Sequence, residues 1–370
     1  MKVLLLSTGG RIGGEETFTK NLALALEKRG HFVIVCPGGE IQKADLLKCG
    51  IKICDVDITS RKPLGIYKAA KKIQEFAIQN SIDVIHAQSI GPALMGVIAK
   101  KIFKCKIPWI WHNHGITDFA YKYVVRHLDA LDLVISNSDY VYVMLRNHGI
   151  SLAKSKRIHN GIDISKFEVT VEEKELNRRK LVSEFNIPIG NSVVTYIGRF
   201  SPEKGVDVLL SAFKQLYEKR KDISCLLVGD GIEKDKFLNF AKTNSCGANI
   251  YFAGFRSDIK EILSMSDILI LPSHIETFSL TTLQAFAVGT PVIASDVGGT
   301  PEQVLSKFNG LLFKDNDIMD LTDKIQYLLS NRKIAYRYSC NAKSLSYSYL
   351  NDDRMIDEIE YEYKKLIQGK

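Results

Sequence analysis

The sequence lacks the features that would place the chain across a membrane. No apolar run approaches the roughly 18 consecutive residues that a membrane-spanning helix needs. The start, MKVLLLSTGGRIGG, has a short apolar part that leads into glycines and charge, so we expect a buried first strand at Val3 to Leu6 and not a secretory signal. The composition, with 45% hydrophobic and 25% charged residues, is typical of a soluble globular protein.

Cysteine patterns of zinc sites and disulfide frameworks are also missing. The seven cysteines are an odd number and no two have CxxC spacing, so zinc is not expected and they are interpreted as small core residues in a reducing cytoplasm. The formal net charge is +8. This charge favours anionic partners such as nucleotides, phosphates or an anionic membrane surface, and it is equally compatible with mere solubility.

A chain of 370 residues is too long for one typical core and predicts two domains. Short β-rich runs alternate with helical patterns in both halves, which predicts an α/β fold of two doubly wound parallel sheets. The expected strands are VLLLS, FVIVCP, IKICDV, DVIHA, PWIWHN and DLVIS, then SVVTYIG, SCLLVG, NIYFAG, DILILP and PVIAS. A turn at Asn160-Gly161 and a charged stretch after it predict a linker at residues 164–175. In such tandem folds a ligand cleft lies where strand carboxyl ends face each other.

The first candidate loop, STGGRIGGEETF, follows the first strand and opens a helix. Glycines such as Gly13 and Gly14 let the backbone approach a ligand, and a helix N-terminus offers free N–H groups to an anion. The spacing is not GxGxxG, so no dinucleotide fingerprint is supported. An ordinary turn explains the two glycines equally well.

The second candidate loop, YIGRFSPEKGVDVLLSAF, places Arg199 and Lys204 between a strand end and a helix start. Two cations in this position can both reach a diphosphate and neutralise its charge as a metal would. The alternative is a pair of solvated surface cations, which the strand-end position disfavours.

The third candidate loop, SHIETFSLTTLQAFAVGTPVIAS, carries the lone carboxylate Glu276 before a helix predicted from Ser279 to Val288. Backbone N–H groups of Phe278, Ser279 and Leu280 are expected to point out of the helix start. Glu276 either caps this helix or accepts hydrogen bonds from the hydroxyls of a bound sugar.

The fourth candidate loop is PWIWHNHGITDF, where His112 and His114 end a strand. A histidine at a strand end can hydrogen-bond a substrate or move a proton, and His114, followed at once by Gly115, is the better candidate. The two share one strand face, but no third ligand is evident nearby, so a metal site is not expected.

In this order and spacing, the loops resemble those of the retaining, nucleotide-sugar-dependent glycosyltransferases of family 4. The resemblance covers nearly the whole chain through GGEETFTKNLALALEKRGHFVIV, DVIHAQS, HNGID, IGRFSPEKGVDVLLSAF, LLVGDG and ETFSLTTLQAFAVGTPVIASDVGGTPEQV. It implies the GT-B fold, with two Rossmann-like domains at 1–165 and 175–345 facing a central cleft and C-terminal helices, about 346–370, that join the first. It also implies sugar transfer to a glycan or lipid-linked acceptor, in bacterial surface polysaccharide synthesis.

The same resemblance implies roles for individual residues. Arg199 and Lys204 would grip the donor diphosphate, Glu276 would contact the donor sugar, and His114 would face that sugar from the first domain. Donor contacts are also implied for Gly13, Gly14, Asp230, Arg256, Phe278, Ser279, Leu280 and Gln284. No DxD-like carboxylate pair stands at a corresponding loop, which suits metal-independent transfer. No cofactor is expected beyond a nucleotide-sugar co-substrate, UDP-sugar favoured over GDP-sugar.

Three positions depart from the family pattern. Gln284 stands where a second glutamate often holds the donor ribose, a change that loses charge-assisted bonds of roughly 1–2 kcal/mol. Thr277 replaces a common glycine, and Gln88 replaces a common histidine. These departures keep two alternatives open, a non-catalytic GT-B scaffold subunit and a GT-B nucleotide-sugar epimerase. Intact Arg199, Lys204 and Glu276 favour the transferase over a scaffold.

Lysines gather in two stretches of the first half, SRKPLGIYKAAKK and AKKIFKCK. A basic face formed by them, including Lys71 and Lys72, would suit peripheral contact with an anionic leaflet or a pyrophosphate-linked lipid. Solvated helix faces are an equally good interpretation. Acceptor recognition is expected in the first domain, and no nucleic-acid partner is expected.

Overall fold

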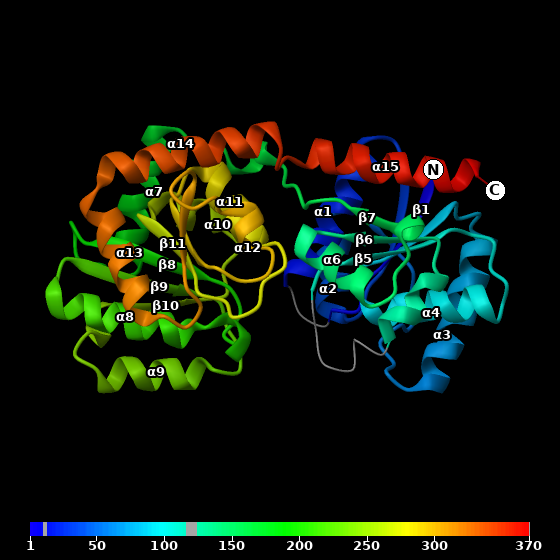
Figure 1. The fold of residues 1–370 in the computed structure, drawn as a ribbon, viewed down its shortest axis with the longest axis horizontal. Coiled ribbons are helices and arrows are strands. Elements are labelled where there is room, and N and C mark those ends of the chain that lie inside the picture. Colours follow the sequence, from blue (N-terminus) through cyan, green and yellow to red (C-terminus); the bar gives the residue numbers. More distant parts are fainter. Residues whose placement is uncertain (10–12, 116–123, 370) are drawn as a thin grey trace. The chain divides into compact units, whose positions relative to one another are not determined.

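The computed structural model describes residues 1–9, 13–115 and 124–369 (Figure 1). The chain forms two compact units, the first from residues 1–160 with 352–370 and the second from residues 161–351. Each unit is built on one parallel sheet, of seven strands in the first and six in the second. The α/β class with two doubly wound parallel sheets is therefore confirmed.

The sheet of the first unit has the strand order β3-β2-β1-β4-β5-β6-β7. Its strands are β1 (Lys2–Leu6), β2 (Phe32–Cys36), β3 (Lys52–Ile53), β4 (Val84–Ala87), β5 (Trp109–Asn113), β6 (Leu133–Ser136) and β7 (Ser155–Arg157). Its helices are α1 (Gly14–Lys28), α2 (Glu40–Lys48), α3 (Pro63–Gln79), α4 (Ile90–Lys101), α6 (Asp139–Asn147) and α15 (Asp352–Gln368). The central strands are buried on both faces, as expected for a sheet covered by crossover helices.

The sheet of the second unit has the order β10-β9-β8-β11-β12-β13. Its strands are β8 (Ser192–Ile197), β9 (Ile223–Val228), β10 (Ile250–Gly254), β11 (Ile268–Leu271), β12 (Val292–Ser295) and β13 (Gly310–Phe313). Its helices are α7 (Val171–Glu184), α8 (Val206–Lys219), α9 (Lys234–Thr243), α10 (Ile259–Met265), α11 (Leu280–Val288), α12 (Thr300–Gln303), α13 (Ile318–Ser330) and α14 (Arg332–Ser348).

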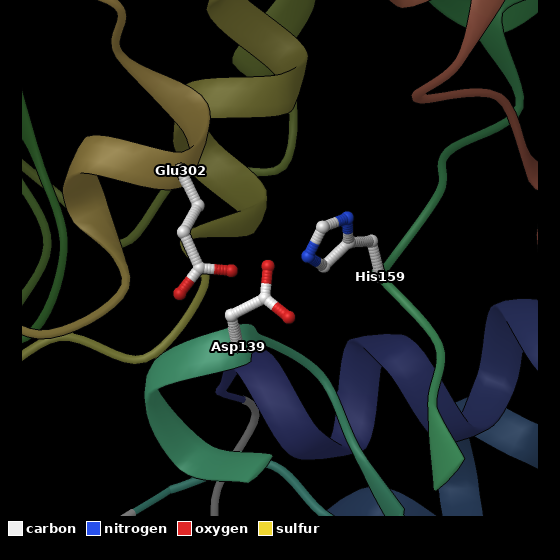
Figure 2. Close-up of side chains that lie close together, drawn as sticks. All are labelled: Asp139, His159 and Glu302. Atoms are coloured by element: carbon white, nitrogen blue, oxygen red, sulfur yellow. The ribbon is translucent and has the colours of Figure 1, made fainter. Parts of the chain in front are cut away.

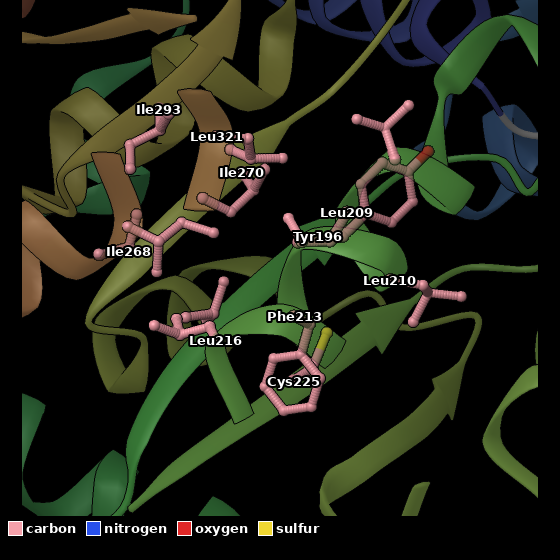
Figure 3. Packing of buried hydrophobic residues seen from close by; sticks show 14 of the residues in the cluster. Tyr196, Leu209, Leu210, Phe213, Leu216, Cys225, Ile268, Ile270, Ile293 and Leu321 are labelled. Carbon is pink, nitrogen blue, oxygen red and sulfur yellow. The ribbon is translucent and has the colours of Figure 1, made fainter. Parts of the chain in front are cut away.

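Strand residues of the second unit alternate between two cores. Val194 and Tyr196 of β8 pack with α8 and α13 on one face, in the cluster drawn in Figure 3. Val193 and Ile197 of the same strand pack with α7, α10 and α11 on the other face. Because side chains alternate with a period of two residues, a continuous apolar run forms a strand that is buried by the helical layers on both faces of the sheet.

One strand of each sheet was not predicted from the sequence. β7 consists of Ser-Lys-Arg and has no apolar run, and β13 is a four-residue strand directly after Asn309. Both lie at a sheet edge. The side chains of β7 are polar and only partly buried, whereas β13, Gly-Leu-Leu-Phe, is mostly buried but short and without β-branched residues. The predicted linker region contains a 3₁₀ turn at Ile164–Phe167 and the start of α7. The domain bounds inferred from the resemblance stay a prediction.

Both sheets reverse their strand order at one point. The reversal lies between β1 and β4 in the first unit and between β8 and β11 in the second. In open α/β sheets the loops that leave the carboxyl ends of these two strands form the usual ligand crevice. Among the described residues, no helix combines the length and apolar character needed to cross a membrane.

Candidate functional site

The switch point of the second unit brings together two of the predicted loops. Arg199 and Lys204 follow β8, and Glu276 follows the adjacent strand β11. The Lys204 ammonium lies 2.9 Å from Glu276 Oε2, and the two side chains are only 26% and 16% exposed. Residues 72 positions apart in sequence therefore form one half-buried charge pair at the place where the fold binds ligands.

Glycines allow the loops at this point to pack closely. Gly205 has a φ of +60°, and a Cβ at this position would lie 2.0 Å from the carbonyl oxygen of Pro272. Gly229 has a φ of +134°, and its Cβ would lie 1.9 Å from the carbonyl oxygen of Gly198. Any side chain at either position would thus force the β8 loop away from its neighbours.

The helix that follows Glu276 is capped by another residue. Ser279 is the N-cap of α11, and its hydroxyl accepts a hydrogen bond from the Thr282 amide. The capping interpretation of Glu276 is therefore wrong. The Ser279 amide N–H donates a hydrogen bond to Oε1 of the buried Gln303, and Nε2 of Gln303 donates one to the Ser279 carbonyl oxygen. Both the N–H and the hydroxyl of Ser279 thus have partners within the protein.

The remaining predicted donor residues of the second unit lie at other positions. Asp230 follows β9, accepts a hydrogen bond from the Gly231 amide and pairs with Lys234. Arg256 follows the edge strand β10, where its guanidinium pairs with Glu184 and Asp258 and these partners raise its pKa. Gln284 lies half-buried on α11, and Leu280 begins that helix.

The switch point of the first unit holds a different kind of chemistry. Gly13 is the N-cap of α1 with extended backbone, and a Cβ at Gly14 would meet no described atom within 4 Å. The carboxyl group of Glu15 accepts hydrogen bonds from the hydroxyls of Ser7, after β1, and Ser89, after β4, and so links the loops that follow these two strands. Burial raises the pKa of Glu15 to about 7, against the lowering effect of the Ser89 hydroxyl.

Three histidines form a row on β4, on β5 and directly after β5. The rings of His86 and His112 are stacked 5.5 Å apart, and those of His112 and His114 are 4.4 Å apart. Tyr363 of α15 lies 2.6 Å from Nδ1 of His86 at one end, and Oε1 of Gln88 lies 2.8 Å from Nε2 of His114 at the other. Burial lowers the pKa of both His86 and His114 to about 3, so the row is neutral at physiological pH.

Another imidazole and carboxylate of the first unit lie near each other, as Figure 2 shows for His159 and Asp139. Their candidate ligand atoms are within 4.8 Å, and the Asp139 carboxylate also accepts a hydrogen bond from Arg157. Glu302, drawn in the same figure, lies on α12 of the second unit. A structural zinc site uses four protein ligands and a catalytic zinc site uses three, so Asp139 and His159 do not make a zinc site by themselves. The prediction that the protein needs no metal stays a prediction.

Comparison with protein families matches both halves of the chain. Residues 12–166 match the model described as Glycosyltransferase Family 4, and residues 177–345 match the one described as Glycosyl transferases group 1. The O-antigen biosynthesis glycosyltransferase WclY of Escherichia coli is 31% identical over 68% of this chain and 70% of its own length. The chain belongs to glycosyltransferase family 4. The predicted family, the GT-B-like pair of sheets and the glycosyltransferase activity are thereby confirmed.

Two further relatives extend the similarity of this glycosyltransferase. An Escherichia coli protein named UDP-Gal:alpha-D-GlcNAc-diphosphoundecaprenol alpha-1,3-galactosyltransferase is 25% identical, covering 83% of this chain and 80% of its own. The structure of Anabaena Alr3699/HepE in complex with UDP-glucose aligns with a TM-score of 0.86 at 23% identity, covering 99% of this chain and all of the other. The structural match shows the shared fold.

Sequence reasoning missed several residues of the glycosyltransferase that the fold places at the two switch points. Gln303 lay in the quoted motif GGTPEQV without an assigned role, and Glu15 lay in GGEETF. Their positions beside the predicted glycines were the available signal. No sequence signal pointed to Tyr363, because its contact with His86 joins positions 277 residues apart in sequence. His274, whose Nδ1 lies 2.7 Å from Asp315 Oδ1, stands in the quoted stretch SHIETF, but that stretch gave no reason to assign it a role.

Proposed function

We propose that this glycosyltransferase takes a sugar from a UDP-sugar, with retention, and passes it to a glycan or lipid-linked acceptor of bacterial surface polysaccharide synthesis. The second unit would hold the donor and the first unit the acceptor. The observation that supports the donor part is the half-buried pair of Lys204 and Glu276 at the switch point between β8 and β11, with Arg199 in the same loop.

The pair has the chemistry that a nucleotide-sugar needs at its reacting bond. Breaking the bond between sugar and phosphate builds negative charge on the leaving diphosphate, and cations fixed in place stabilise that charge. The Lys204 ammonium has three donors, so it can keep Glu276 and still bind a phosphate oxygen. The Glu276 carboxylate is held by the same contact and would accept hydrogen bonds from donor sugar hydroxyls.

The choice of uridine rests on the relatives. HepE binds UDP-glucose, and the galactosyltransferase relative is named for UDP-Gal. Gly14 gives independent support for a ligand at the first unit, because neither the backbone angle nor a described neighbour requires a glycine there. His114 would face the transferring sugar, and Asp230, Arg256 and Gln284 would lie near the nucleoside.

A basic surface of the first unit supports contact with an anionic membrane. We name as the basic face the exposed lysines of α3 and of the end of α4, together with the apolar side chains among them; its members are Leu64, Tyr67, Lys68, Lys71, Lys72, Lys101, Ile102 and Lys104. The rings of Tyr67 and Phe103 lie 5.1 Å apart and join the two helices. Lysines with interspersed apolar residues are the usual means of peripheral binding to anionic lipid.

Nucleotide binding tests the donor site directly. The melting temperature of the wild type and of Arg199→Ala should be measured with UDP, GDP, ADP and CDP. A ligand at 100 times its Kd stabilises the protein by about 2.7 kcal/mol, which moves Tm by several degrees. We expect a shift with UDP that the variant loses. No shift with any nucleotide would contradict the donor site and favour the non-catalytic scaffold.

Vesicle binding tests the basic face. Reversing Lys71 and Lys72 to glutamate should reduce sedimentation with vesicles of anionic lipid and leave binding to zwitterionic vesicles unchanged. The matched control reverses Lys219 and Lys221, two exposed lysines of the second unit. Equal loss in both double variants would mean that only net charge matters, and no loss in either would contradict the membrane contact.

A further inference from the structure

The side chain of Gln88 is buried between two histidines of the first unit. It is 1% exposed, and its backbone amide donates to the Leu6 carbonyl, which fixes the residue between β4 and β1. Its Oε1 lies 2.8 Å from Nε2 of His114, and its Nε2 lies 3.4 Å from the carbonyl oxygen of His86.

These two contacts determine which way the amide points. A backbone carbonyl is only an acceptor, so the group that faces the His86 carbonyl must be the amide NH₂. The opposite orientation would place two acceptor oxygens against each other in a buried site, and such unsatisfied polar contacts are costly. The carboxamide oxygen of Gln88 is therefore the group that faces His114.

A carboxamide oxygen in turn determines the state of the imidazole. Oxygen accepts, so Nε2 of His114 must carry the hydrogen, and Nδ1 of the neutral ring is then an acceptor. Phe18 packs against His114 with ring centroids 4.3 Å apart, and the fully buried His112 ring is stacked on His114 at 4.4 Å. Burial also lowers the pKa of His114, which keeps the ring neutral.

We propose that Gln88 is a positioning residue that holds His114 as the Nε2–H tautomer, so that the ring presents an acceptor, and not a proton, at Nδ1. This inference rests on the proposed role of His114 beside the donor sugar for its consequence in catalysis. A sugar hydroxyl, which can donate, fits such a ring, whereas a carboxylate, which can only accept, does not. The site would then select donors with a hydroxyl group at this position over uronic acids.

Nitrogen NMR of the imidazole rings tests the tautomer without any assay of activity. The protein labelled with ¹⁵N-histidine is compared with His114→Gln, which assigns the His114 signals among the eight histidines. We expect Nε2 of wild-type His114 to carry the hydrogen and Nδ1 to be bare. In Gln88→Met, which keeps the length of the side chain and removes the acceptor, the ring should shift to the other tautomer or a mixture. Gln88→Glu, which keeps an acceptor oxygen, should retain the wild-type pattern.

Kinetics then connects the tautomer to the reaction. We expect Gln88→Met to lower kcat about 10- to 100-fold with less than a threefold change in KM, and Gln88→Glu to restore part of kcat. An Nδ1–H tautomer in the wild type, or an unchanged tautomer in Gln88→Met, would overturn the proposal. If Gln88→Met does not fold, the wild-type spectrum and Gln88→Glu still decide it. Full activity of His114→Ala would instead refute the proposed role of His114 and leave the tautomer result standing.

Discussion

The two switch points occupy the same place in two similar sheets, yet they treat charge in opposite ways. In the second unit a lysine and a glutamate form a half-buried ion pair, and an arginine lies in the same loop as the lysine. In the first unit Glu15 has its pKa raised to about 7, and the buried histidines have theirs lowered, so that burial disfavours the charged form of each group. The fold alone therefore does not determine the chemistry of its crevice.

The contrast fits the ligands that we propose for the two crevices. A diphosphate carries charge that must be neutralised, and cations can be kept there only with a partner or with solvent, because an isolated buried charge is costly. A sugar carries hydroxyl groups, which neutral donors and acceptors satisfy without that cost. The comparison predicts that removing charge should affect catalysis in the second unit, whereas changing protonation should affect stability in the first.

The largest expected effect is the loss of the Lys204 charge. Lys204→Met should lower kcat/KM for the UDP-sugar by about 10²- to 10³-fold, or about 3–4 kcal/mol, because a fixed cation at the developing diphosphate charge is removed. Steady-state kinetics with the donor varied measures this loss.

Lys236→Met is the matched control, since Lys236 is also ion-paired, with Glu233 and Asp207, but lies on α9. It should change kcat/KM less than twofold. Equal effects of the two variants would mean that general charge, and not the switch point, accounts for donor use.

The contrast also separates what the sequence could predict from what it could not. Apolar runs with β-branched residues identified the central strands, because both faces of these strands are buried and the composition reflects it. β7 was not predicted because its Ser-Lys-Arg sequence has no apolar residue, and β13 was not predicted because Gly-Leu-Leu-Phe is short and has no β-branched residue. Lys204 and Glu276 were recognisable because each lies in the loop between a strand end and a helix start, at a position that the topology of the fold assigns to ligands.

The chemistry of the first unit was harder to predict from the sequence, for a physical reason. The states of Glu15 and of the histidines depend on burial by residues far away in sequence, such as Tyr363 of α15, and no local pattern carries that information. The strand end points to His114, whereas the sequence shows Gln88 only as a departure from the family pattern and not as the partner of His114. The role of Glu276 was ambiguous for a similar reason, since the cap of α11 is set by backbone geometry at Ser279.

An intermediate effect is expected from the pH dependence of stability at Glu15. The pKa of this group rises from 4.5 in the unfolded chain to about 7 in the folded one, so the folded state binds the extra proton between these values. Its contribution to stability is fully present below pH 4.5 and is lost as pH rises through about 7, by up to about 3 kcal/mol. The buried histidines act with the opposite sign, since their lowered pKa makes stability fall as pH drops below 6.5.

Glu15→Gln isolates the carboxyl group from the histidines. Urea unfolding of wild type and variant between pH 4.5 and 8 should give a difference in unfolding free energy that falls with rising pH, because the variant cannot lose the proton. Glu75→Gln makes the same change on the exposed face of α3 and should alter stability little at any pH. A flat difference for Glu15→Gln would mean that this carboxyl group is charged in the folded protein, and the contrast between the two crevices would weaken.

The smallest expected effect is a change in UDP affinity when Gln284 of the second unit is replaced by glutamate. If Gln284 lies beside the donor ribose, Gln284→Glu should strengthen a hydrogen bond from a ribose hydroxyl by roughly 1–2 kcal/mol and tighten UDP binding about 5- to 30-fold. Titration calorimetry with UDP measures the gain, and 2′,3′-dideoxy-UDP, which has no such hydroxyl, should bind both proteins equally. A gain that is equal for the two nucleotides would arise from the charge at α11 and not from the ribose. A loss for both would indicate repulsion from the diphosphate, because Gln284 lies on the helix that begins just after Glu276, and would place the phosphates closer to α11 than the Lys204–Glu276 pair alone requires.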